Sequence, residues 1–592
     1  MYKRYVLFLA LVMVVVVAFP SQAIASKMTK ITIEEGMQRE KLVNPFDHPY
    51  TTGQGIPFQP GTVLDSPGEL IGTSHYDYQT NSSTGNRVAK DAMGGIHIVW
   101  MNGIDFWSGD RWVYYNFKDE TGVWIWPGQG TQVNTTQGAG YTQLNIMADG
   151  RAVPIYHSEA NGLFTCMGLD ILRGFGDFTE IDVPQVSGEY DYYWPYSTID
   201  RSERIHIIST EMTGVAGDPH AFIYTSSADE GNSWTDPEIV DTTMDLSAVM
   251  TSSRISDKVC IAYTRPRTLI APDQYNNDMV YIESVDGVTW DWTQIVNVTN
   301  YQTLDTIRAY CDCDAVYDYN GNLHLLWNTP YYDEIGGYIS IAECLLWHWS
   351  EATGITLVAN CWWLSAPGAW NRSASKMSLG VDENNNLYAL WTQFTDDDNS
   401  VGGYSNGELY VCGSRDGGAT WSPRVNVTNS PTPDCWPTEC DSDHWSTLGE
   451  QVDDYLHITY TNDKDAGGIP QTEGVDTENP MMYLAVDTVD VWTATGVEEQ
   501  EVPLPTAFGL KQNYPNPFNA STTIGYITLT SGQVELAVYN LRGEKVEVLV
   551  NKAVPAGEHT VTWDAGSVAS GVYYYKLTTS EGTAAKRALL LK

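Results

Sequence analysis

The most regular pattern in the chain is a short apolar segment that recurs along residues 85–492. Each copy combines β-branched, aromatic and aliphatic side chains and follows a turn rich in Asp, Asn and Gly. A period of about 50 residues, with three or four strand-like stretches per unit, is typical of a β-propeller blade. The seven copies are Ile96–Trp100, Ala152–Tyr156, Ile205–Ser209, Val259–Tyr263, Leu323–Trp327, Leu387–Trp391 and Leu456–Tyr460.

Seven copies predict seven blades, and a six-bladed ring with one degenerate unit is the alternative. The last unit has few residues after its third strand, so its fourth strand must come from elsewhere. Leu70–Gln79 alternates like a strand, and we expect it to complete the last blade. Such closure removes a sheet edge that would otherwise pair with other chains.

A second motif, S-x-D-x-G-x-x-W, follows the third strand of two units, and a third unit has it one residue short. Asp in a hairpin turn accepts backbone N–H bonds, Gly adopts a positive φ, and Trp packs between sheets. We therefore expect turn-forming rather than catalytic residues. They are Ser227, Asp229, Gly231 and Trp234; Asp286 and Trp290; and Ser414, Asp416, Gly418 and Trp421.

These motifs resemble the Asp boxes of the bacterial neuraminidase repeat in sialidase-like propellers, over about 400 residues. The resemblance implies that the boxes lie on the outer rim, away from any active site. A sialidase also needs three arginines to clamp a carboxylate, a Tyr nucleophile with a Glu base, and an Asp acid.

Three arginines are weak candidates for that clamp. Arg87, Arg308 and Arg372 stand at or just before the innermost strand of a predicted unit. Glu211 is a candidate base, although the sequence offers many other carboxylates. The alternative is that these arginines pair with acidic residues nearby, so no catalytic residue is assigned.

The last 89 residues differ in composition, since residues 504–592 carry a small positive balance. Short alternating strands predict a small Ig-like β-sandwich. The segment resembles the type A C-terminal sorting domain of type IX secretion cargo, through Leu510–Asn519, Val538–Gly543, Ala556–His559, Trp563–Asp564, Ser570–Tyr573 and the tail Lys586–Lys592. The resemblance implies passage across the outer membrane of a Bacteroidetes-like bacterium. An Ig-like carbohydrate-binding appendage is the alternative.

The N-terminus has the features of a secretory signal peptide. Lys3 and Arg4 precede the apolar run Val6–Ala18, and Ala23–Ala25 supplies a small-residue cleavage site. The predicted organisation is therefore signal peptide 1–25, N-terminal extension 26–69, propeller 70–492, linker 493–503 and sorting domain 504–592, an all-β chain throughout. No later stretch is long enough to act as a transmembrane anchor.

The net charge and the spacing of possible metal ligands limit the partners and cofactors that we expect. A formal charge of −42 argues against nucleic acid as a partner, because phosphates would be repelled. No zinc-ligand spacing occurs, and His157, His206 and His324 are interpreted as packing residues. No cofactor is expected; calcium at the acidic loops Asp396–Asp398 and Asp463–Asp465 is only weakly supported. Cys435 and Cys440 are close enough to pair.

Two functions remain. The first is a secreted or cell-surface propeller, exported by the type IX machinery, that binds extracellular glycan or protein at the mouth of its ring. The second is a sialidase-like exo-glycosidase acting on acidic sugars. Arginines grouped at the mouth of so acidic a protein would favour an anionic ligand.

Overall fold

The computed structural model describes residues 30–32, 66–493 and 509–591, apart from 81–82, 106–109, 159–163, 187–190, 213–218, 244–247, 268, 270–276, 302–306, 333–337, 362–364, 369–370, 512, 514–515, 517, 529–531, 541, 555–556 and 580–581. The signal peptide predicted at 1–25 lies outside these residues, as does most of the linker. The chain divides into two compact units, Met1–Thr495 and Gly496–Lys592.

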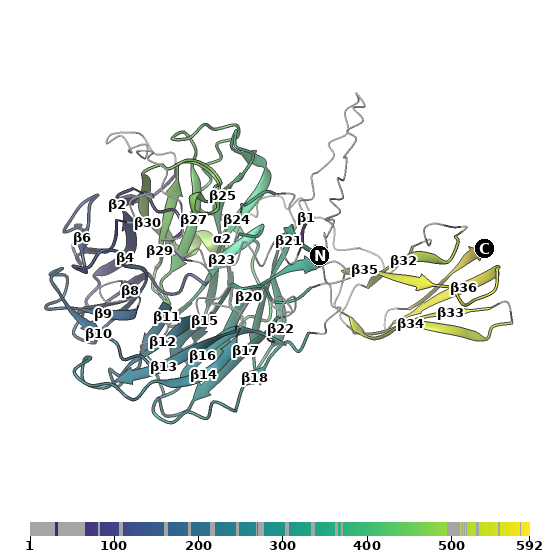
Figure 1. Cartoon of the computed structure of the whole chain (residues 1–592), viewed down its shortest axis with the longest axis horizontal. Helices are drawn as coiled ribbons and strands as arrows, with labels where there is room; N and C mark the ends of the chain where they lie inside the picture. Colours follow the sequence, from purple (N-terminus) through teal and green to yellow (C-terminus); the bar gives the residue numbers. More distant parts are fainter. Residues whose placement is uncertain are drawn as a thin grey trace, which may run out of the picture. The chain divides into compact units, whose positions relative to one another are not determined.

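The first unit is a seven-bladed propeller, built of antiparallel sheets that follow one another along the chain (Figure 1). Blades 1 to 3 are β3 (Val88–Lys90), β4 (Ile96–Gly103), β5 (Arg111–Lys118) and β6 (Thr131–Gln132); β7 (Gly140–Ile146), β8 (Ala152–Ser158), β9 (Phe164–Asp170) and β10 (Phe178–Asp182); and β11 (Asp191–Ile199), β12 (Ile205–Met212), β13 (His220–Ser227) and β14 (Glu238–Thr243).

Blades 4 to 6 continue the same order from the innermost strand outward. They are β15 (Ala248–Ser252), β16 (Val259–Pro266), β17 (Asn277–Ser284) and β18 (Val296–Asn297); β19 (Cys313–Tyr317), β20 (Leu323–Tyr332), β21 (Tyr338–Ser350) and β22 (Gly354–Asn360); and β23 (Ala374–Asp382), β24 (Leu387–Asn399), β25 (Ser405–Ser414) and β26 (Val425–Asn426). Two short strands extend these sheets: β1 (Lys30–Thr32) pairs with β21, and β28 (Gln451–Val452) pairs with β23.

The seventh blade joins the two ends of the propeller. It contains β27 (Ser442–Leu448), β29 (Tyr455–Asp463), β30 (Asn479–Asp487) and, outermost, β2 (Glu69–Ser74). β2 pairs antiparallel with β30, so the predicted closure is confirmed. The strand ends at Ser74 and not at Gln79, because the residues that follow turn inward, where the His75 N–H donates to the Gly103 carbonyl.

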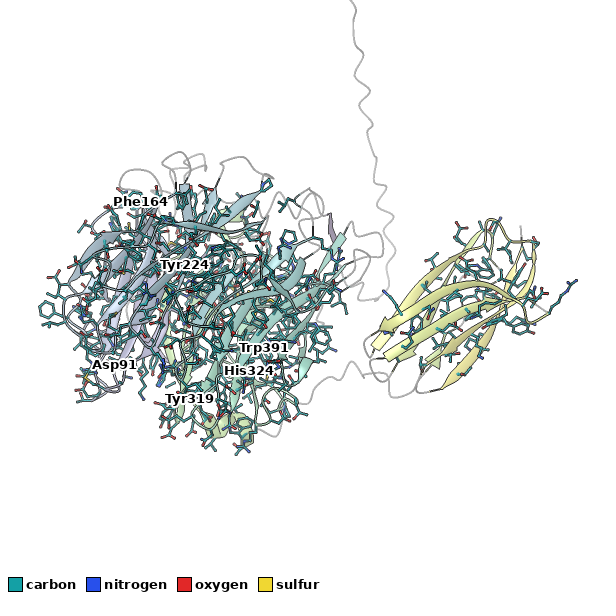
Figure 2. All side chains as sticks on the ribbon, turned by 90° about the horizontal axis from the view of Figure 1, so that it is seen from below. Asp91, Phe164, Tyr224, Tyr319, His324 and Trp391 are labelled. Carbon is teal, nitrogen blue, oxygen red and sulfur yellow. A yellow bond between two sulfur atoms is a disulfide. The ribbon has the colours of Figure 1, made fainter. Side chains whose placement is uncertain are left out.

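The core lies between successive blades, where the apolar repeat segments pack face to face. Trp391, from the predicted segment of blade 6, is completely buried in a cluster shared by blades 5 and 6 (Figure 2). The only helical elements described are η2 (Ile469–Gln471) and α2 (Thr488–Thr493). Within the described ranges, no helix has the length and apolar character needed to cross a bilayer.

The antiparallel strands give the propeller two distinct faces. We call the face where the innermost strands begin the mouth face; connections from the second to the third strand and between blades also lie there. The opposite face, here the turn face, carries the tight turns between first and second and between third and fourth strands. Side chains near the start of the innermost strands therefore lie at the mouth face, around the axis of the propeller.

The second unit is a two-sheet sandwich. One sheet contains β31 (Gly509–Leu510), β32 (Ser521–Thr528) and β35 (Gly557–Asp564), and the other contains β33 (Gly532–Tyr539), β34 (Lys545–Val554), β36 (Gly571–Thr578) and β37 (Thr583–Leu590). Trp563 and Phe518 pack in its core. The architecture agrees with the predicted Ig-like sandwich.

Candidate functional site

The innermost strands of four blades contain the same irregularity at the mouth face. In each, the pairing with the second strand skips two residues, and the first of the two has a left-handed backbone although it is not glycine. These residues are Tyr141 (φ 54), Trp194 (φ 43), Lys376 (φ 55) and Trp445 (φ 56). We call these four residues the bulge ring. Bulges of this kind re-aim side chains, and they are frequent next to active sites.

The bulge ring is costly to maintain. A left-handed conformation at a bulky residue is an outlier and costs about 1–3 kcal/mol at each position. Glycine would relieve that strain, yet the four positions hold one Tyr, two Trp and one Lys. Strain that repeats around an axis at large or charged side chains points to a functional requirement at the mouth.

Trp445 lies between two cations. The Lys376 ammonium is 4.9 Å from the centre of its ring, and the Arg87 guanidinium donates to its carbonyl oxygen. Tyr78 packs on the same indole with ring centres 4.7 Å apart. Trp445 therefore connects blades 1, 6 and 7 in one aromatic and cationic cluster.

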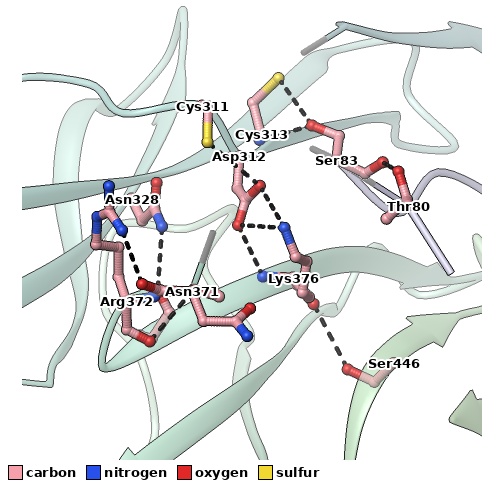
Figure 3. Close-up of polar contacts among 12 residues, drawn as sticks. Thr80, Ser83, Cys311, Asp312, Cys313, Asn328, Asn371, Arg372, Lys376 and Ser446 are labelled. Atoms are coloured by element: carbon pink, nitrogen blue, oxygen red, sulfur yellow. Dashed lines mark hydrogen bonds and ion pairs between the residues drawn. The ribbon is translucent and has the colours of Figure 1, made fainter. Parts of the chain in front are cut away.

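Lys376 is neutralised by a carboxylate, and Arg87 is not. Lys376 Nζ lies 3.1 Å from Asp312 Oδ1, with both side chains 1% exposed (Figure 3). Arg87 also donates to Thr447 Oγ1 at 3.2 Å, but no carboxylate of the described residues forms an ion pair with it. Burial lowers the pKa of Arg87 to about 9, so it stays cationic at neutral pH.

His444 lies in the same cluster, with its ring centre 5.3 Å from that of Trp445. Burial, with Lys376 and then Arg87 opposing a third positive charge, lowers the pKa of His444 to about 3. Its Nε2 lies 3.2 Å from Asp463 Oδ2. His444 is therefore neutral at physiological pH and adds no charge to the cluster.

A second part of the cluster joins blades 1 to 3. The Arg111 guanidinium lies over the rings of Tyr76 and Tyr141, at 4.9 and 5.8 Å from their centres. The two tyrosine oxygens are 3.5 Å apart. Tyr141 in turn packs on His157 and Trp194, with ring centres 5.0 and 6.0 Å away. Burial and then Arg111 hold the pKa of His157 well below its usual range.

The segment between β2 and β3 crosses the ring below these aromatic side chains. Gln79 Nε2 donates to the Met101 carbonyl in blade 1. Ser83 accepts from the Tyr196 hydroxyl of blade 3 through its carbonyl, and from the Cys313 N–H of blade 5 through its Oγ. A small cavity of about 10 Å³ lies beside Asn86, with the carboxyl groups of Asp314 and Glu450 in its wall.

The structure places the other two predicted arginines in a related position. Arg372 lies over the ring of Tyr310, 3.6 Å from its centre, and its Nη1 donates to the Asn371 carbonyl. Arg308 stands two residues before Tyr310 and is also buried. The contacts thus connect Arg372 with the segment of Arg308, while Arg87 is connected with Lys376 through Trp445.

Glu211 has a tyrosine partner. The Tyr192 hydroxyl donates to Glu211 Oε1 at 3.0 Å. Tyr192 packs with Ala221 and Ile223 in a small cluster of its own, whereas the neighbouring Tyr193 and Trp194 belong to the central cluster. The Tyr–Glu pair therefore lies on the other side of blade 3 from the bulge ring.

The Ser–Asp–Gly–Trp motifs form turns on the turn face, away from the mouth. The Gly231 N–H donates to Ser227 Oγ at 2.8 Å, and the Ser233 N–H donates to Asp229 Oδ1 at 2.8 Å. The second full motif repeats this pattern: Gly418 donates to Ser414, and Thr420 donates to Asp416. Asp286 accepts from Val288 and Thr289. Trp234, Trp290 and Trp421 are half-buried against the core.

Two carboxylates of the acidic loops have partners within the protein. Among the described residues, no group of three or more His, Cys, Asp or Glu side chains is arranged to hold an ion. In the acidic loops, Asp398 accepts from Asn406 and Thr432, and Asp463 contacts His444. Cys435 and Cys440 form a disulfide.

Most residues of the cluster were not among the predicted site residues. Tyr141, Trp194, Lys376 and Trp445 all stand near the beginning of predicted innermost strands, which was a usable signal. Their left-handed backbone leaves no trace in the sequence, because glycine would normally mark it. Arg111 begins the third strand of blade 1, and Tyr76 lies just after β2. Only the three-dimensional fold brings these two residues to the mouth.

The C-terminal unit identifies the export route. Residues 512–590 match the family described as secretion system C-terminal sorting domain. The chain thus carries a type IX sorting tail, handled by that machinery, and is a secreted or outer-membrane surface protein with a β-propeller as its main unit. No curated protein matches the chain.

Several solved structures are similar to the chain at low identity. An ulvan lyase of polysaccharide lyase family PL25 shares 10% identity over 73% of this chain and 100% of that chain, with a TM-score of 0.45. An α-L-arabinanase from Penicillium chrysogenum, complexed with arabinobiose, shares 10% over 58% and 92%, with a TM-score of 0.37. A lectin from Burkholderia pseudomallei shares 7% over 64% and 93%, with a TM-score of 0.40.

Proposed function

We propose that the protein is an extracellular glycan-binding propeller whose mouth takes an acidic sugar. The bulge ring carries this proposal: four strained positions hold buried aromatic and cationic side chains around the axis at the mouth face. Arg87 adds a buried cation that pairs with no carboxylate among the residues that the structure describes, in a protein of charge −42. Burying such a charge is unfavourable unless a counter-ion completes it, and a ligand carboxylate or sulfate would supply one.

The aromatic side chains suit the rest of a sugar. Sites for small ligands combine apolar walls with a few placed polar groups. Trp445 and Tyr78, both buried, pack together beside Arg87 and would supply apolar contact for a sugar that reaches it. The sorting tail supports an extracellular ligand, because it directs the protein to the cell surface or beyond it.

Native affinity electrophoresis tests this function. Gels containing polygalacturonate, alginate or chondroitin sulfate should retard the protein, whereas gels containing dextran should not. Arg87→Met should remove most of the retardation, and the effect should weaken with salt. Arg201→Met is the matched control, because Arg201 is exposed on the turn face and pairs with Asp257. Equal retardation of wild type and Arg87→Met, or none in any acidic gel, would refute the proposal.

The alternative is a sialidase-like exo-glycosidase. One observation favours it, the hydrogen bond from Tyr192 to Glu211, since a Tyr nucleophile with a Glu base distinguishes sialidases from other glycosidases. Release of fluorophore from a fluorogenic sialoside, abolished by Tyr192→Phe and by Arg87→Met, would establish it. We expect no release, because Tyr192 packs outside the central cluster.

A further inference from the structure

The loop between blades 6 and 7 presents an isolated tryptophan to solvent. Trp436 is 64% exposed, and it is the only tryptophan of the described residues that is more than about a third exposed. None of the described residues makes a hydrogen bond or ring contact with its indole. A single exposed apolar residue is ordinary on a protein surface, so the case rests on how this one is held.

The Trp436 loop is fixed in place by covalent and backbone constraints. Cys435 and Cys440 bracket it in a disulfide. Asp434 and Thr438 have left-handed backbones at φ 61 and φ 78, an unfavourable conformation for a β-branched threonine. The Thr438 N–H donates to the Lys464 carbonyl in blade 7, and the Val401 N–H donates to the Cys435 carbonyl from blade 6. The loop is therefore clamped on both sides.

The clamped loop lies on the mouth face, because it connects the outermost strand of blade 6 with the innermost strand of blade 7. Val401, which touches the loop through its N–H, is itself 45% exposed. We call Trp436 and Val401, two exposed residues joined through the bond from the Val401 N–H to the Cys435 carbonyl, the rim platform. Trp445 of the bulge ring follows Trp436 by nine residues and lies in β27, the strand that the loop leads into.

We propose that the rim platform is a second subsite of the glycan, where Trp436 stacks on a sugar ring beyond the one held at the mouth. The inference rests on the proposed function. A flat, apolar indole face suits the C–H face of a pyranose ring, and an aromatic side chain held rigid loses little conformational entropy on binding. A chain of several sugars would reach from the bulge ring outward to the platform.

Titration calorimetry with fractions of two lengths tests the subsite. Wild type and Trp436→Ala are titrated with disaccharide and decasaccharide fractions of polygalacturonate, alginate and chondroitin sulfate. Trp436→Ala should weaken binding of the decasaccharide by about tenfold and leave the disaccharide unchanged. Trp436→Tyr should restore most of the affinity. Phe175→Ala is the matched control, since Phe175 is 55% exposed and lies in a turn between β9 and β10 on the turn face.

Each outcome decides the inference. Unchanged decasaccharide binding by Trp436→Ala would overturn the subsite while leaving the proposed function intact. An equal loss for the disaccharide would place Trp436 in the mouth site itself. Wild type that binds neither length would refute the proposed function, and the subsite with it. Self-association that Trp436→Ala abolishes would assign the platform to a second copy of the chain.

Discussion

The Nε2 atom of His97 lies 2.9 Å from Oδ2 of Asp91, and both side chains are completely buried. The other ring nitrogen, Nδ1, lies 2.7 Å from the Tyr115 hydroxyl. Asp91 stands in the turn between the first two strands of blade 1, His97 in the second strand and Tyr115 in the third. The triad therefore ties three successive parts of one blade together.

The same triad recurs in other blades. In blade 3, His206 bonds Asp200 and Tyr224, and in blade 7, His457 contacts Asp453 and Tyr483. In blade 5, His348 replaces the tyrosine as the partner of His324, which faces Asp318. Histidines that are scattered singly along the sequence thus belong to a repeated structural device. It accounts for His206 and His324 without any catalytic role.

Removing a triad histidine should destabilise the propeller. His206→Phe would leave Asp200 and Tyr224 buried without their partner, at a cost of about 2–4 kcal/mol in the free energy of unfolding. Urea unfolding followed by tryptophan fluorescence measures it. Arg201→Met, in the adjoining exposed turn, should change the same quantity by less than about 0.5 kcal/mol. A loss below about 1 kcal/mol for His206→Phe would mean that the triad contributes little.

Because of Asp443, we expect a contribution to the free energy of unfolding that decreases as the pH rises, the opposite of the usual effect of a carboxyl group. Burial and then the neighbouring Glu408 raise the pKa of Asp443 to about 7. The folded protein therefore keeps a proton that the unfolded chain has already lost above about pH 4. The resulting stabilisation is present at low pH and is lost as pH rises from about 4 to 7, by up to about 1.4 kcal/mol per pH unit.

Asp443→Asn, which mimics the protonated carboxyl, isolates this contribution. The free energy of unfolding of wild type relative to the variant should fall between pH 4.5 and 7 and become constant above about 7.5. Parallel urea titrations of both proteins across this range measure the difference. A constant difference would show that Asp443 is ionised in the folded protein throughout.

The C-terminal unit should be dispensable for the propeller fold. We propose that residues 504–592 act only in export, since the contacts divide the chain near residue 495 and the sorting family covers residues 512–590. Deleting 504–592 should leave the melting temperature of the propeller unchanged within about 2 °C. In a type IX-competent host the truncated protein should accumulate in the periplasm. Its normal appearance at the cell surface would contradict the export role.

The parts of the fold that could be predicted from the sequence are those marked by a repeated pattern or by a gap in that pattern. Segments such as Leu323–Trp327 indicate a buried strand because an apolar segment recurs about every 50 residues. The closing role of β2 followed from a strand missing in the last unit. The bulge ring could not be predicted, because Trp194 or Lys376 in a strand context is indistinguishable from a regular residue. Arg87 was predicted from its position before an innermost strand, but that no described carboxylate pairs with it depends on the packing of the folded chain.

Substitutions of Lys376 and Asp312 test how much their buried ion pair contributes to the stability of the mouth. Both are almost completely buried, so Lys376→Met would leave the Asp312 carboxylate without its cation and cost about 3–5 kcal/mol in the free energy of unfolding. The double variant Asp312→Asn/Lys376→Met should recover most of that loss. Lys258→Met is the control, since Lys258 and its partner Glu283 are more exposed, and it should cost less than about 1 kcal/mol.

Asp312→Asn alone separates the role of this pair in stability from its role in binding. The substitution removes the carboxylate that neutralises Lys376, so the mouth gains one positive charge beside Trp445. Retardation in polygalacturonate and chondroitin sulfate gels should therefore increase, although the variant is less stable than wild type. If Asp312→Asn binds acidic polysaccharide more weakly while it remains folded, the ammonium of Lys376 does not face the ligand, and the anionic site must be centred on Arg87 alone.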